Sequence, residues 1–175
     1  MTNFTIAKND YSLQDGIAVL TAIFKKGYLA QEGGFYQHYF SMVTTGYKFG
    51  NFANFPPRIV DSINEVAERA AIRLSHTRIT DEDVVGQIKA LGKWVNLPNL
   101  FQTEMGWTYG KMNGRLRLKT ATCYGKFSAE ELRDINETIN RMALKAMQVH
   151  IVLPVQDNID NKVETATDVQ DSSKE

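Results

Sequence analysis

The chain has 175 residues, and its 20 Lys+Arg balance 20 Asp+Glu to a formal net charge of zero. This length predicts one domain with a sizeable core, and the composition, 43% hydrophobic and 23% charged, is typical of a soluble globular protein. A single cysteine, Cys123, excludes an internal disulfide framework. The chain has neither a signal-peptide pattern nor an apolar run long enough to span a bilayer, so we expect a cytoplasmic protein that does not enter a membrane.

The zero net charge hides an uneven distribution along the chain. Residues 156–175 carry −4, and residues 1–155 carry +4. Within that body, residues 105–126 hold five cations and no acidic residue. Such asymmetry is typical of nucleic-acid binding or of an interaction tail. We therefore expect a single domain over 1–155, followed by a disordered acidic tail over 156–175.

Four segments have apolar residues at helical spacing. Each also carries start or stop signals: Ser12 and a Gly27 stop for the first, Pro57 for the second, Thr80 with Asp83 for the third, and Ser128 with Glu131 for the fourth. The predicted helices span 12–26, 57–75, 81–95 and 129–148. A short β-branched run at 149–153 could add a strand.

Residues 33–55 contain eight aromatic rings and no acidic residue. Thr44-Thr45-Gly46 resembles a turn, which predicts two strands or extended pieces near 35–43 and 47–53, although 36–39 could also be helical. The rings could be core, an oligomer interface, or surfaces on which nucleic-acid bases stack.

Asn113-Gly114 lies between two segments that could be strands, 107–112 and 115–124. This dipeptide tolerates the positive φ angles of a type I′ turn and predicts a hairpin. With a two- or four-residue loop, Arg115, Arg117 and Lys119 share one face of the hairpin. Trp107, Tyr109 and Lys111 then lie on the other, more apolar face, while a three-residue loop would invert the partition. The basic face could contact phosphates, be merely solvated, or oppose edge pairing.

The resulting expectation is an α+β fold of about four helices packed on a small antiparallel sheet that contains the basic hairpin, and not a standard OB-fold. Catalysis is not expected. The three histidines have no metal-ligand spacing, no glycine pattern matches a phosphate loop, and Cys123 has no adjacent base signal. We accordingly expect no cofactor and no bound metal.

A compact body with a basic hairpin, an aromatic-rich segment and an acidic tail resembles the small phage-type single-stranded DNA-binding proteins. The resemblance is one of organisation, and the terminal residues 171–175 depart from the aromatic or apolar ending usual for such tails. It implies a non-enzymatic binder of single-stranded nucleic acid in replication or transcription, with a polymerase or similar protein partner and self-association. Phosphate contacts would come from Lys111, Arg115, Arg117, Lys119 and Lys126, with Lys48 as a further cation. Base stacking would come from Trp107, Tyr109, Tyr36, Tyr39, Tyr47, Phe49 and Phe52.

Two other readings stay open at this stage. Helices at 57–75 and 81–95 followed by a basic "wing" also fit a winged-helix regulator of duplex DNA, although Asp81, Glu82 and Asp83 would stand at the end that normally enters the groove. A viral assembly or interaction subunit would instead use the aromatic segment as its interface.

Overall fold

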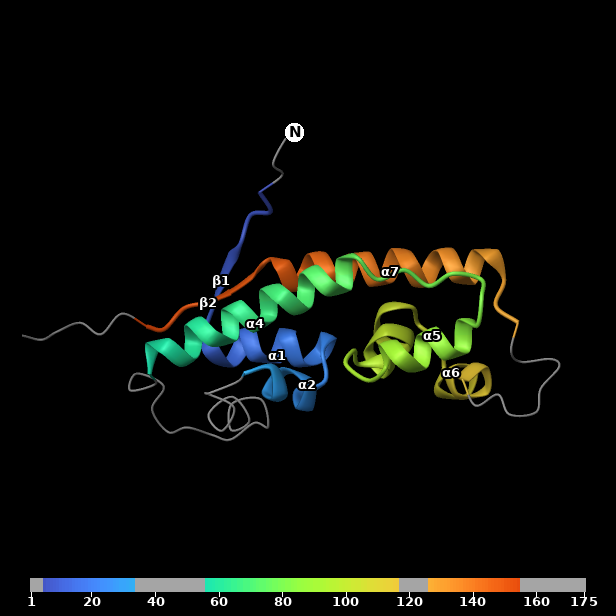
Figure 1. Cartoon of the computed structure of the whole chain (residues 1–175), viewed down its shortest axis with the longest axis horizontal. Helices are drawn as coiled ribbons and strands as arrows, with labels where there is room; N and C mark the ends of the chain where they lie inside the picture. Colours follow the sequence, from blue (N-terminus) through green and yellow to red (C-terminus); the bar gives the residue numbers. More distant parts are fainter. Residues whose placement is uncertain (1–4, 34–55, 117–125, 155–175) are drawn as a thin grey trace, which may run out of the picture.

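The computed structural model describes residues 5–33, 56–116 and 126–154. These residues form seven helices and a two-stranded parallel sheet (Figure 1). The fold is thus mostly helical, and the predictions of about four helices and of an antiparallel sheet are wrong. The predicted elements at 35–43 and 47–53 and the acidic tail lie outside the described residues.

Two long antiparallel helices, α4 (Pro57–Ser75) and α7 (Ala129–Met147), form the frame of the molecule (Figure 1). Both match their predicted ranges closely. All five residues of the apolar stripe predicted for 57–75 are buried: Ile59, Ile63, Val66, Ala70 and Leu74. The predicted capping box of α7 is confirmed, because the Ser128 hydroxyl accepts from the Glu131 N–H and the Glu131 carboxylate accepts from the Ser128 N–H.

An asparagine on each long helix holds an extended segment of the chain. The Asn64 amide donates to the Ile151 carbonyl over 2.9 Å and accepts from the Ile151 N–H over 2.8 Å. Asn136 makes the same pair of bonds with Ile79, both at 2.8 Å. Each asparagine side chain therefore makes the pair of backbone hydrogen bonds that a neighbouring strand would otherwise provide on that side of the segment.

The segment predicted as one helix over 12–26 is two helices, α1 (Leu13–Ile23) and α2 (Lys26–Glu32). Ser12 caps α1 as predicted. Gly27, which was predicted to end this helix, lies inside α2 instead. The break falls at Phe24, which is fully buried and extended, and which pairs with Val95 in an antiparallel bridge. Burial of the Phe24 ring against Trp94, with ring centroids 6.1 Å apart, outweighs continuation of the helix.

The helix predicted at 81–95 is shorter, α5 (Val84–Leu91). Asp83 has a left-handed backbone with φ of 40° and accepts from the Gly86 N–H, so Asp83 is the cap in place of Thr80. Beyond α5 the chain enters a π-helix, η3 (Asn99–Glu104), that the sequence did not predict. Its Leu100 and Phe101 are fully buried.

The sheet joins the two ends of the described chain. Strand β1 (Asn9–Tyr11) pairs in parallel with β2 (Val149–Ile151), in a register that places Asp10 beside His150. Strand β2 confirms the strand suggested for 149–153, whereas β1 was not predicted. Three residues of ordinary composition carry no pattern long enough to mark a strand.

The predicted basic hairpin is wrong over its described part. Residues 109–116, including Asn113-Gly114, form a helix, α6 (Tyr109–Leu116), and residues 117–125 lie outside the described residues. Thr108 caps α6, with its hydroxyl accepting from the Lys111 N–H over 3.1 Å. Met112 packs into the core and Leu116, four residues on, lies partly buried against it. Tertiary packing of this face overrides the turn preference of Asn-Gly.

Candidate nucleic-acid interface

The helix α6 begins after a sharp turn of the chain at Gly106. Gly106 has φ of +69°, a conformation that L-residues rarely adopt, and no atom lies within 4 Å of where its Cβ would stand. The following residue, Trp107, donates its backbone N–H to the Phe101 carbonyl over 2.8 Å. This turn lets the chain leave η3 and start α6 with Trp107 packed against the core.

Trp107 is the centre of an aromatic cluster. Its ring lies 4.9 Å from that of Phe101 and 6.3 Å from that of Phe127, measured between centroids. The Lys111 ammonium sits 4.2 Å from the Trp107 ring centroid, a cation–π contact. Trp107 is therefore partly buried with a cation on its ring, and it is not a bare surface for base stacking.

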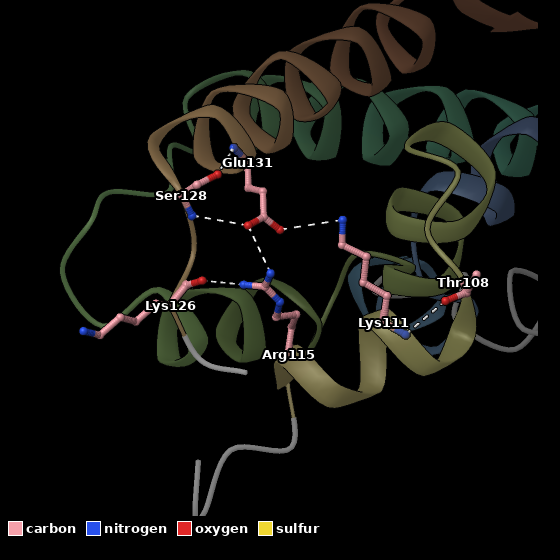
Figure 2. Close-up of polar contacts among 6 residues, drawn as sticks. All are labelled: Thr108, Lys111, Arg115, Lys126, Ser128 and Glu131. Carbon is pink, nitrogen blue, oxygen red and sulfur yellow. Dashed lines mark hydrogen bonds and ion pairs between the residues drawn. The ribbon is translucent and has the colours of Figure 1, made fainter. Parts of the chain in front are cut away.

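Lys111 and Arg115 converge on one carboxylate, that of Glu131 (Figure 2). The Arg115 guanidinium lies 3.2 Å from Glu131 Oε1, and the Lys111 ammonium lies 3.8 Å from Glu131 Oε2. The predicted hairpin would have put these two cations on opposite faces. On α6 they are four residues apart and share a face, which is why one carboxylate can reach both.

Arg115 also connects the two ends of the segment between α6 and α7. Its guanidinium donates to the Lys126 carbonyl and lies 5.6 Å from the Phe127 ring centroid. Its side chain is only 21% exposed, and that of Glu131 is 18% exposed. Arg115 is therefore a structural residue in this state of the protein, and a phosphate could reach its guanidinium only by competing with Glu131.

The remaining described candidates are open to solvent. Tyr109, at the start of α6, is 62% exposed, and the Lys111 side chain keeps 44% exposure despite its ion pair. The Lys126 side chain extends away from Glu131 (Figure 2). An exposed ring thus stands two residues from an exposed ammonium, in a segment that contains no acidic residue.

Acidic residues limit where a polyanion could lie around this region. Trp107 borders a shallow hollow that also exposes Asp134 and Glu137 of α7. Lys126 borders another hollow, shared with Asp81 and Asp83. The repulsion expected from these carboxylates leaves the surface around Tyr109 and Lys111 as the better approach for phosphates.

The structure brings together only part of the predicted site. Trp107, Tyr109, Lys111, Arg115 and Lys126 lie on or beside α6. The other predicted contacts fall outside the described residues: Arg117, Lys119, Tyr36, Tyr39, Tyr47, Lys48, Phe49 and Phe52.

Sequence reasoning missed Glu131 as a member of this cluster. The Ser128–Glu131 spacing predicts a helix start and gives no sign of the partners of Glu131 on α6. A helical reading of 109–116 would have placed Lys111 and Arg115 on one face and indicated that both need an acidic partner.

Comparisons of the chain with models of protein families, with curated proteins and with solved structures found no match. No helix of the described residues is both long and apolar enough to cross a membrane. Within the same residues, no three His, Cys, Asp or Glu side chains gather as a metal site would require.

Proposed function

We propose that this protein is a non-enzymatic, cytoplasmic binder of single-stranded nucleic acid that acts in replication or transcription. The observation that carries the proposal is the acid-free segment 105–126, in which the exposed ring of Tyr109 lies two residues before the partly exposed Lys111. Single-strand binders combine such cations with rings on which bases stack. The aromatic segment 33–55 and the acidic residues of 156–175 support the same proposal. They are the parts of the resemblance to small phage-type single-stranded DNA-binding proteins that do not depend on the hairpin.

The structure changes which residues would make the first contacts. Lys111 would make the first phosphate contact, and Tyr109 would stack on a base. Arg117, Lys119 and Lys126 would be further phosphate contacts, although Asp81 and Asp83 disfavour an anion at Lys126. Arg115 would join them only after leaving Glu131. Because the carboxylate of Glu131 lies where a phosphate between Lys111 and Arg115 would lie, Glu131 acts as an internal competitor for the ligand.

The proposal predicts a steep dependence of affinity on salt. If about four phosphates are neutralised, the slope of log K against log salt should be near −2.8 for a single strand. Affinity should then fall about fifty-fold between 50 and 200 mM salt. Tryptophan fluorescence during titration with poly-dT, at both salt concentrations, measures this slope.

Tyr109→Ala is the sharpest variant for this experiment, because the ring is exposed and its loss should leave the fold intact. Loss of one stacked base should weaken binding by roughly five- to 150-fold. Lys93→Gln, a loss of one exposed cation outside the acid-free segment 105–126, is the control and should change affinity less than about twofold. Binding without salt dependence, or a Tyr109→Ala variant that binds like the parent, would contradict the proposal. Tighter binding to a duplex than to the single strand would contradict it as well.

A further inference from the structure

The two-stranded sheet has one open edge among the described residues. In the β1–β2 ladder, the N–H of Asn9 and the carbonyl of Tyr11 bond toward β2, to Gln148 and Val152 respectively. The N–H and carbonyl of Asp10, between them, therefore point away from β2. The far edge of β2 is already occupied, because Asn64 bonds both backbone groups of Ile151.

The open edge of β1 is accessible. Residues 7–10 are exposed, and Figure 1 shows β1 at the margin of the molecule, with the chain that leads into it extending away from the helices. Within the described part of the chain, no hydrogen bond reaches the backbone of Asp10. A parallel sheet of only two strands is also unusual, since parallel strands are normally found inside larger, covered sheets.

The residues along this edge are complementary to themselves in the antiparallel direction. Lys8 and Asp10 have opposite charges and flank Asn9. When two copies of this segment pair about a two-fold axis through Asn9, Lys8 of each copy stands opposite Asp10 of the other. These are also the residues whose backbone groups face outward, so the same register satisfies both the hydrogen bonds and the charges.

An apolar surface adjoins the edge. Ile6, Ile72 and Met147 line a hollow together with Lys8 and Glu68. The side chain of Ile72 is 45% exposed, which is high for an isoleucine on an amphipathic helix. A second copy paired along β1 would lie next to this hollow and could remove its apolar residues from water.

We propose that β1 is the dimerisation edge of the protein, where it pairs antiparallel with β1 of a second copy. The two β1–β2 sheets then join into one four-stranded sheet across the two-fold axis. Lys8 can keep its 3.4 Å ion pair with Glu68 while it contacts the partner, because an ammonium has three donors. Isolated charges of one sign would repel at such an edge, whereas this pair of opposite charges attracts its own copy.

Sedimentation velocity tests this proposal independently of the proposed function. The full chain is measured without nucleic acid, at concentrations that span roughly a hundredfold range. The wild type should shift from 19.8 kDa toward twice that mass. Asp10→Lys should raise the dimer dissociation constant by about tenfold, because two attractive contacts become repulsive. The swap of Lys8→Asp with Asp10→Lys should restore wild-type dimerisation, since it recreates both pairs.

Two further variants keep the test decisive if Asp10→Lys perturbs the fold. Asp10→Pro removes an outward-facing N–H that β2 does not use, so it should abolish the dimer and leave the thermal unfolding of the monomer nearly unchanged. Asp61→Lys makes the same charge change on exposed α4 and should dimerise like the wild type. A wild type that stays monomeric, a dimer insensitive to Asp10→Pro, or a swap that fails to restore pairing would overturn the proposal.

Discussion

Helices α6 and α7 meet at Glu131, yet different forces hold them in place. Helix α7 has 19 residues and buries six of them along one face, so apolar packing holds it. Helix α6 has eight residues, two of them glycine, and buries only Met112. Its position depends on the contacts of Lys111 with Trp107 and of Lys111 and Arg115 with Glu131. The more weakly held helix is the one that carries the candidate ligand contacts.

The largest expected difference between the two helices comes from truncating their cores. Ile139→Ala in α7 removes a fully buried side chain and should lower the free energy of unfolding by about 3 kcal/mol. Met112→Ala in α6 should instead speed amide hydrogen exchange over residues 109–116. It should lower the free energy of global unfolding by only about 1–2 kcal/mol. Urea unfolding with hydrogen exchange measures both, and exposed Asn140→Ala is the control. If the two truncations lowered the free energy of global unfolding equally, α6 would be as integral to the core as α7.

Two smaller effects, opposite in sign to each other, are expected from substituting the two glycines around the start of α6. Gly110→Ala should stabilise α6 by up to about 1 kcal/mol, because the position is helical and no atom lies within 4 Å of the added Cβ. Gly106→Ala has the same free space but a φ of +69°, so it should destabilise by roughly 1 kcal/mol. Thermal unfolding of the two variants gives the comparison. Destabilisation by Gly110→Ala would show that residues 109–116 are not a helix in solution.

The contrast between α6 and α7 also explains why the sequence predicts the long helices correctly and α6 incorrectly. The stripes of α4 and α7 repeat over five turns and agree with their start signals, so their ranges were predicted almost to the residue. Asn113-Gly114 is a strong signal for a turn, but it is local. The packing of Met112, the cap from Thr108 and the contacts with Glu131 together outweigh it. A segment whose structure depends on a carboxylate at least 15 residues away cannot be predicted from its own dipeptides.

For the candidate site, the sequence offered a choice of residues but the wrong geometry for Lys111 and Arg115. The absence of acids over 105–126 drew attention to its cations, of which Lys111, Arg115 and Lys126 lie among the described residues. The assumption of a strand then separated Lys111 from Arg115, and it hid their common partner. The parallel β1–β2 pair could not be foreseen for a different reason: each strand has three residues, and their pairing depends on how α4 and α7 bring the ends of the chain together.

The most direct test of the proposed role of Glu131 is the affinity of Glu131→Gln for an oligo-dT single strand. Glutamine can still accept from the Ser128 N–H, so the capping box survives while the charge between Lys111 and Arg115 is removed. We expect binding about three- to tenfold tighter than the wild type at low salt, with a smaller difference at high salt. Glu65→Gln, which removes an exposed charge from α4, should leave affinity nearly unchanged. Unchanged or weaker binding by a folded Glu131→Gln variant would contradict the account.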